Sequence, residues 1–233
     1  MNYFKTLFFI FCLSSTLSLT LSNKVFATSV ALANKSSNNI DVLVFGDSLS
    51  AAYNIPTDKG WVHLLQQSLN EKKINSLVSN ASISGETSSG GLVRFQSQID
   101  KSKPGIVILE LGANDGLRGA NLQTTQSNLV AMINMSHEIG ADVILAGILI
   151  PPNYGRTYTR KFSQIYSDLA LLEKVSLIPF ILEGVATHQD LMLDDGLHPN
   201  EEGQKIIVQT VLKHLLPVIE SRKIQTEIKS KLE

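Results

Sequence analysis

The chain has 233 residues, and 43% of them are hydrophobic, which is enough to build a core for one domain of ordinary size. The formal net charge is −1 at pH 7, and no run of basic residues stands out. Because binding to phosphate backbones requires a concentrated positive face, the sequence argues against a nucleic-acid partner.

The N-terminus has the layout of a secretory signal peptide. Lys5 supplies the positive start, residues 7–21 are apolar, and Val25-Phe26-Ala27 places small residues at the −3 and −1 positions of a cleavage site. The alternative is an uncleaved membrane anchor, but 7–21 is shorter than the roughly 20 apolar residues of a usual span. We therefore expect residues 1–27 to be a signal peptide, and the protein to be exported to the periplasm or secreted.

Removal of residues 1–27 leaves about 206 residues without a thiol, because Cys12 is the only cysteine. Disulfides, cysteine–zinc sites and a cysteine nucleophile are then excluded together. Loss of Lys5 and Lys24 changes the formal charge from −1 to −3. The mature chain is expected to have no stable membrane span, and its near-neutral composition without a long apolar patch favours a monomer.

Strand and helix patterns alternate after a flexible leader at 28–39. Short apolar runs predict strands, and apolar residues at helical spacing predict helices. We expect one domain at 40–219 and a charged tail at 220–233. The predicted strands are 40–45, 77–78, 106–111, 143–150 and 175–178. The predicted helices are 61–69, 92–99, 121–139, 162–172 and 201–219.

This alternation predicts an α/β fold with three layers, in which helices cover both faces of a mostly parallel sheet. Ligands of such folds bind outside the carboxyl ends of the strands. Ser48 follows the first predicted strand, Gly85 the second, Asn114 the third and Tyr154 the fourth. These four residues should therefore gather at one edge of the sheet.

Asp195 and His198 predict a catalytic pair, because an acid three residues before a histidine can place both side chains on one turn. Ser48 supplies the nucleophile, and the chain order Ser, Asp, His is a permitted one. Asp194 is one residue out of this register. The alternative is structural: Asp47 or Ser48 caps a helix that starts near Ser48. His198 then belongs to a helix-entry turn, with Asp194 and Asp195 as solvated loop acids.

Acyl transfer also needs hydrogen-bond donors for the developing oxyanion. The backbone N–H of Ser48 is one candidate, and Gly85 can bring a second N–H close because it has no side chain. Asn114 can add its side-chain amide. Gly85 and Asn114 each have an alternative interpretation, because glycine and asparagine are also common in ordinary turns.

The motifs resemble those of the GDSL or SGNH hydrolases, over about residues 40–216. The similarity is greatest to the exported bacterial branch of arylesterases, acyl-CoA thioesterases and lysophospholipases. The matching blocks are Gly46-Asp47-Ser48-Leu49, Gly85, Gly112-Ala113-Asn114-Asp115 and Asp195-Gly196-Leu197-His198-Pro199. Ala113 is a departure, because close members of this branch often have a second glycine there.

The resemblance implies a flavodoxin-like SGNH hydrolase domain with a catalytic triad of Ser48, Asp195 and His198. It also implies an open site and a mobile loop at 150–158 that contacts the acyl chain through Pro152, Asn153 and Tyr154. The expected activity is hydrolysis of acyl esters or thioesters through an acyl-enzyme, without a metal or an organic cofactor. Activity should fall in mild acid as His198 gains a proton.

Two other functions stay open. One is a carbohydrate acetyl esterase, because the wider family includes such enzymes. The other is a non-catalytic α/β module that binds a nucleotide or flavin, although the turn after the first strand has neither a Gly-x-Gly-x-x-Gly nor a Walker pattern.

Overall fold

The computed structural model describes residues 39–232, so the predicted signal peptide and nearly all of the predicted leader lie outside the described residues. The strands are β1 Val42–Gly46, β2 Val78–Asn80, β3 Ile106–Glu110, β4 Asp142–Ala146 and β5 Ser176–Ile178. The α-helices are α2 Trp61–Glu71, α3 Ser88–Ser102, α4 Ala113–Leu117, α5 Leu122–Glu138, α6 Arg156–Leu172 and α7 Glu201–Leu232. Short 3-10 helices are η1 Thr57–Lys59, η2 Pro152–Tyr154 and η3 Gln189–Leu191.

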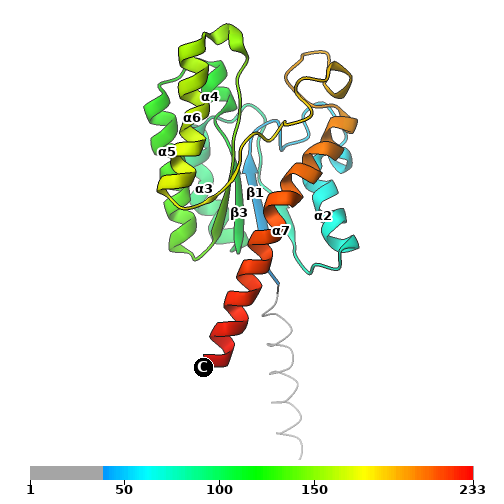
Figure 1. Ribbon diagram of the computed structural model, residues 1–233, viewed down its shortest axis with the longest axis vertical. Coiled ribbons are helices and arrows are strands. Elements are labelled where there is room, and N and C mark those ends of the chain that lie inside the picture. The colour runs from blue at the N-terminus through cyan, green and yellow to red at the C-terminus, as the bar shows by residue number, and fades with distance from the viewer. Residues whose placement is uncertain (1–38, 233) are drawn as a thin grey trace, which may run out of the picture. The chain divides into compact units, whose positions relative to one another are not determined.

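The five strands form one parallel sheet in the order β2-β1-β3-β4-β5. In its centre, Val44 lies opposite both Asn80 and Ile108. Helices cover both faces, with α2 and α7 on one side and α3, α5 and α6 on the other (Figure 1). The predicted three-layer α/β/α fold is confirmed.

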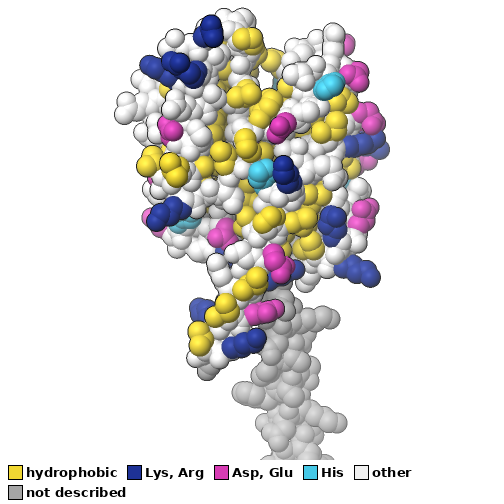
Figure 2. All heavy atoms as spheres, in the orientation of Figure 1, with side chains coloured by type: hydrophobic (Ala, Val, Ile, Leu, Met, Phe, Trp, Pro, Cys, Tyr) yellow, Lys and Arg dark blue, Asp and Glu magenta, His cyan; other side chains and the backbone are white. Residues whose placement is uncertain are grey.

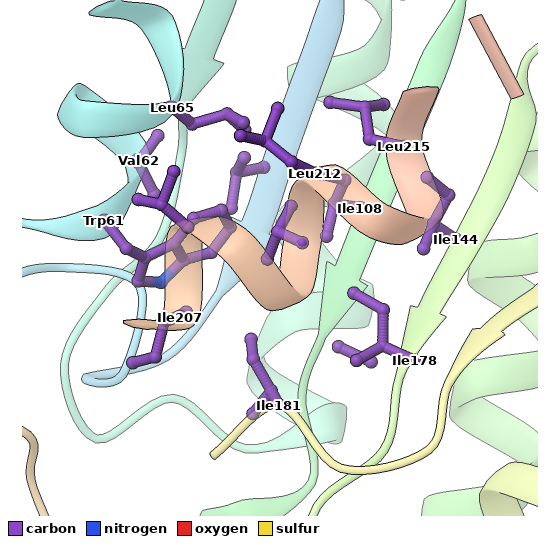
Figure 3. Close-up of a cluster of buried hydrophobic side chains, with 14 of the residues drawn as sticks. Trp61, Val62, Leu65, Ile108, Ile144, Ile178, Ile181, Ile207, Leu212 and Leu215 are labelled. Carbon is purple, nitrogen blue, oxygen red and sulfur yellow. The ribbon is translucent and has the colours of Figure 1, made fainter. Parts of the chain in front are cut away.

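The alternation of side chains along each strand creates two hydrophobic cores. Val42 and Val44 face α2 and α7, whereas Leu43 and Phe45 face the other three helices. The same alternation continues through β3 and β4, whose apolar residues are almost all completely buried. Figure 3 shows the core on the side of α2 and α7.

Trp61, at the start of α2, joins this core to the turn that carries Ser48. Its ring is completely buried, and its Nε1 donates to the carbonyl oxygen of Leu49 at 3.1 Å. Its backbone N–H donates to Oε1 of the buried Gln204 on α7, at 2.9 Å. The turn that carries Ser48 is thus attached to both helices of its layer.

Several predicted elements have different bounds. The fourth strand was predicted to reach Ile150 but β4 ends at Ala146. The next residue, Gly147, passes so close to Pro179 that a Cβ would lie 2.3 Å from its carbonyl oxygen. The chain then leaves the sheet. The second predicted helix, 92–99, begins earlier than expected, at Ser88, where the Thr87 side chain accepts from the backbone N–H of Gly90. The sequence did not predict this first turn, because the Gly90-Gly91 pair disfavours a helix.

Helix α7 continues past its predicted end at Ile219 as far as Leu232. Its last part extends beyond the sheet and carries hydrophobic side chains on the face seen in Figure 2. Ile224, Ile228 and Leu232 are each about half exposed or more. Among the described residues, no helix is long and apolar enough to span a membrane.

The central strand gives a direct test of the core. Ile108 on β3 is completely buried among the residues of α2 and α7, so Ile108→Ala should reduce the free energy of unfolding by about 2–5 kcal/mol. Val93→Ala is the matched control, because Val93 is 88% exposed on α3, and it should change stability by less than ~0.5 kcal/mol. Urea unfolding measures both. Equal losses in the two variants would contradict the described packing.

Candidate active site

Ser48, His198 and Asp195 form a continuous chain of hydrogen bonds at the carboxyl edge of the sheet. The Ser48 Oγ lies 2.9 Å from Nε2 of His198, and Nδ1 of His198 lies 2.7 Å from Oδ2 of Asp195. Two of these residues are separated by 150 positions in the chain. The arrangement is that of a nucleophile, a base and an orienting carboxylate.

A compact loop between η3 and α7 holds the acid and the base. The backbone N–H groups of Leu197 and His198 both donate to Oδ1 of Asp195, at 2.9 and 3.0 Å. Gly196 has φ +63°, a value that glycine adopts without strain. Partial burial acts to raise the pKa of Asp195, but these hydrogen bonds and the bond and charge of His198 lower it below its usual value. Asp195 is therefore an ionised partner for His198.

Tyr53 packs against the imidazole. Its ring centroid is 4.4 Å from that of His198 with the planes tilted by 36°. Tyr53 follows the nucleophile turn and is 38% exposed. It thus covers one face of the base while leaving its edge open to Ser48.

Ser48 does not start a helix, which corrects the sequence-based expectation. Residues 47–54 form consecutive turns, and the next helical segment is η1. Ala52 and Asn54 have φ of 58° and 56°, values that interrupt a right-handed helix. The helix-cap interpretation of Ser48 therefore does not apply.

Two buried carboxyl groups, Asp47 and Glu110, lie directly beneath this turn. Ser50 Oγ and the Asp47 backbone N–H donate to Glu110 Oε2, at 2.7 and 3.3 Å. Burial raises the pKa of Asp47 to about 6, and burial next to Asp47 raises that of Glu110 well above its usual value. Gly46 is required here, because a Cβ would lie 2.5 Å from Oε2 of Glu110.

Three donors border the space in front of Ser48. The backbone N–H groups of Ser48 and Gly85 have no acceptor within residues 39–232. The Asn114 amide nitrogen donates to Oδ2 of Asp47 at 3.1 Å. Ser48, Gly85, Asn114 and His198 line one pocket, so the structure brings together all five residues predicted for the triad and the oxyanion site.

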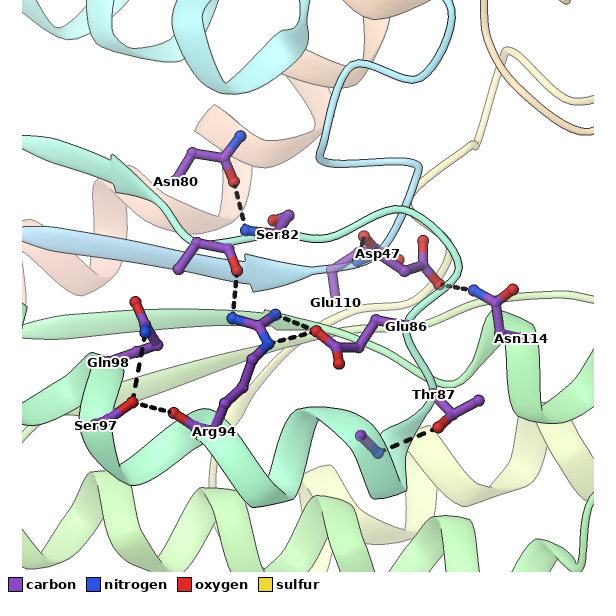
Figure 4. Close-up of polar contacts among 12 residues, drawn as sticks. Asp47, Asn80, Ser82, Glu86, Thr87, Arg94, Ser97, Gln98, Glu110 and Asn114 are labelled. Carbon is purple, nitrogen blue, oxygen red and sulfur yellow. Dashed lines mark hydrogen bonds and ion pairs between the residues drawn. The ribbon is translucent and has the colours of Figure 1, made fainter.

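The loop that contains Gly85 is fixed from both sides. Arg94 on α3 pairs with Glu86 (Figure 4) and donates to the carbonyl oxygen of Ala81. Its guanidinium group also lies over the ring of Phe45, 4.0 Å from the centroid. On the other side, Nη2 of Arg118 donates to the carbonyl oxygen of Gly85 at 3.1 Å. Gly85 itself has φ +79°, so a side chain there would strain the turn.

The pocket has a volume of about 300 Å³ and a mainly apolar wall. Eight of its lining residues are leucine, isoleucine or proline: Leu49, Leu117, Ile148, Leu149, Ile150, Pro151, Leu182 and Leu197. Pro152, Asn153 and Tyr154, which were predicted to contact substrate, form η2 and do not line it. The predicted loop at 150–158 is also shorter, because α6 begins at Arg156.

Sequence reasoning missed several of these residues. Glu110 carries a visible signal, since it is the one acid in an otherwise apolar strand, VILE. Tyr53 and Leu182 carry none, because only the folded chain brings them to His198 and to the pocket. Within residues 39–232, no three His, Cys, Asp or Glu side chains lie close enough to hold a metal ion.

Comparison with known proteins agrees with this geometry. The model of the GDSL-like Lipase/Acylhydrolase family matches residues 44–206. The chain is 45% identical over 178 residues to Esterase TesA of Pseudomonas aeruginosa, which covers 76% of this chain and 89% of the relative. It is 40% identical, also over 178 residues, to Thioesterase 1/protease 1/lysophospholipase L1 of Escherichia coli K12, covering 76% and 84%.

Solved structures are similar as well. The crystal structure of TesA superposes with a TM-score of 0.74 at 45% identity, covering 76% of this chain and 98% of the other. The psychrotrophic esterase EstA from Pseudoalteromonas sp., inhibited by monoethylphosphonate, gives a TM-score of 0.75 at 37% identity, covering 77% and 98%. The fold and these similarities define a hydrolase with a flavodoxin-like α/β/α fold. The chain belongs to the GDSL-like lipase/acylhydrolase family.

The buried acid predicts an unusual dependence of stability on pH. Because the pKa of Glu110 is raised on folding, its contribution to stability is complete below its unfolded pKa and is lost as pH rises through the folded value. Between pH 5 and 8, the free energy of unfolding should therefore fall by ~1 kcal/mol or more beyond the fall seen in Glu110→Gln.

Urea unfolding at several pH values measures this difference. Glu71→Gln, at an exposed position at the end of α2, is the matched control and should follow the wild type. If the free energy of unfolding changes with pH in parallel for the wild type and Glu110→Gln, the pKa of Glu110 is not raised in the folded protein.

Proposed function

We propose that this protein is an esterase that cleaves acyl esters through an acyl-enzyme on Ser48. Acyl thioesters are cleaved by the same steps, with a thiol in place of the alcohol as leaving group. The observation that carries the proposal is the hydrogen-bonded chain from Ser48 through His198 to Asp195, which opens on an apolar pocket. A nucleophile, a base and an acyl-binding wall are thus available in one place.

In the proposed acylation step, Ser48 attacks the carbonyl carbon while its proton moves to Nε2 of His198. The ionised Asp195 stabilises the resulting imidazolium and keeps Nδ1 protonated. The negative charge on the carbonyl oxygen is stabilised by the N–H groups of Ser48 and Gly85 and by the amide of Asn114. His198 then gives its proton to the leaving alcohol or thiol as the tetrahedral intermediate collapses.

Deacylation repeats these steps with water. His198 takes a proton from a water molecule, which attacks the acyl-enzyme, and the acid is released when Ser48 regains the proton. The route uses only protein groups and water. In each step His198 acts as the base in its neutral form.

The wall of the pocket favours an acyl chain as the group bound beside Ser48. Leu117, Ile150 and Leu182 offer hydrophobic contacts but no polar atoms for sugar hydroxyls. The relatives are named Esterase TesA, Arylesterase and Thioesterase 1/protease 1/lysophospholipase L1. The esterase, thioesterase and lysophospholipase parts of these names agree with substrates that carry an acyl chain. A carbohydrate acetyl esterase is therefore the less favoured alternative.

The site of action is proposed to be outside the cytoplasm. The argument is the signal-peptide pattern of residues 1–27, with Lys5, the apolar segment 7–21 and a cleavage site after Ala27. In an exported location an ester is a more accessible substrate than a cytoplasmic acyl thioester.

Replacement of the nucleophile tests the proposal. Ser48→Ala should reduce kcat on p-nitrophenyl esters by about 10⁴-fold or more, because the variant cannot form the acyl-enzyme. Ser167→Ala, at an exposed serine of α6 that bonds only within its helix, is the control and should keep full activity. Labelling by a fluorophosphonate should occur in the wild type and disappear in Ser48→Ala. Equal turnover in Ser48→Ala would contradict the proposal.

The acyl-binding wall gives a second test. Leu149 lines the pocket, so Leu149→Ala should lower kcat/KM for p-nitrophenyl octanoate by roughly 3- to 10-fold, in line with the lost hydrophobic contact. The same variant should lose less than about twofold on the acetate ester, which cannot reach the wall. Equal losses on both esters, or a wild-type preference for acetylated oligosaccharides, would favour the carbohydrate esterase instead.

A further inference from the structure

Asp47 is completely buried beside Ser48, yet the reaction described above does not use it. Its two carboxylate oxygens have different partners. Oδ1 accepts the backbone N–H of Leu49 at 3.1 Å and closes a local turn. Oδ2 accepts the side-chain amide of Asn114 at 3.1 Å, across 67 residues of sequence (Figure 4).

The contact with Asn114 fixes which end of its amide group faces Asp47. An ionised carboxylate only accepts hydrogen bonds, so it selects the NH₂ group and excludes the amide oxygen. The second N–H of the same nitrogen has no acceptor within residues 39–232, and Asn114 lines the pocket in front of Ser48. The carboxylate thereby leaves one amide N–H for the oxyanion.

If residue 47 could donate a hydrogen bond, the amide of Asn114 could turn over. Its oxygen would then face residue 47 and the pocket in place of the N–H. An oxygen at that position repels a developing oxyanion, and the site loses a donor. The charge state of Asp47 therefore decides whether Asn114 assists the reaction.

Glu110 allows this charge to exist in the core. Two carboxylates so close cannot both be ionised at low cost, because each raises the energy of the other. Oε2 of Glu110 accepts from Ser50 and from the Asp47 backbone, whereas Oε1 has no partner and is free to hold a proton. Asp47, whose oxygens both accept N–H groups, is the better site for the single negative charge.

We propose that Asp47 is a positioning residue that orients the Asn114 amide for oxyanion stabilisation, and that the buried acid Glu110 holds the proton of the pair. This inference rests on the proposed function but concerns a residue outside the triad. Other charged or titratable groups near Asp47 are Asp115 on α4, His198 before α7, and Tyr166 on α6.

A double-mutant cycle tests whether Asp47 acts through Asn114. Asn114→Ala should lower kcat by about 10²- to 10³-fold, as expected for loss of one oxyanion donor. Asp47→Asn keeps an acceptor for Leu49 but can donate to Asn114, and it should lower kcat by about 10- to 100-fold with little change in KM. In the Asn114→Ala background, the same change should cost less than about threefold.

An independent cost of Asp47→Asn, equal in both backgrounds, would overturn the inference. Ser48→Ala in parallel separates this outcome from failure of the proposed function. Activity that survives Ser48→Ala would overturn the proposed function, whereas an equal cost of Asp47→Asn with Ser48→Ala inactive would overturn the inference alone. Thermal unfolding of every variant identifies losses that arise from misfolding.

The pH dependence of kcat/KM gives a second readout. The ionised form of Asp47 exists above its pKa and is lost as pH falls. The wild-type profile should therefore fall more steeply on its acid side than the profile of Asp47→Asn, which lacks this carboxylate. Identical acid limbs in the two proteins would contradict the inference.

A measurement on the unmodified protein covers the case in which Asp47→Asn does not fold. The side-chain ¹⁵N–H₂ signals of Asn114, observed by NMR between pH 5 and 8, should shift as Asp47 gains its proton. Signals that stay constant over this range would overturn the inference. The exposed amide of Gln96 on α3, which bonds Asp100, is the control.

Discussion

The active site depends on one constraint, the common direction of all five strands. Because every strand is parallel, each of the connections that follow β1 to β4 begins at the same edge of the sheet. Ser48, Gly85, Asn114 and the pocket residues after β4 meet there although they come from separate parts of the chain. Asp195 and His198 reach the same edge from the loop before α7.

The sequence was sufficient for the fold class and for the residues whose chemistry follows from local spacing. Asp195 and His198 belong to one turn, so their relation could be predicted from the chain itself. The bounds of β4 were not predictable, because the strand ends where Gly147 meets the backbone of Pro179. The pocket wall was missed for the same reason: Leu182 and Tyr53 reach it through tertiary contacts that no local pattern encodes.

The layer beneath Ser48 shows how the turn of the proposed nucleophile is supported from the core. Gly46 allows Glu110 to approach, Glu110 binds Ser50 and the backbone of Asp47, and Asp47 reaches Asn114. This network joins β1, β3 and α4 directly below Ser48. Burying a polar network of this kind costs free energy. Such networks are found at functional sites, and this one lies directly under the turn that carries Ser48, the proposed nucleophile.

The outer strands of the sheet differ from the inner ones, because β2 and β5 have three residues each whereas β1, β3 and β4 have five. A sheet edge exposes unpaired backbone groups that can recruit a strand from another molecule. With so few residues at either edge, a foreign strand would gain only a few hydrogen bonds by joining the sheet. The short edge strands thus protect the fold against edge-to-edge aggregation.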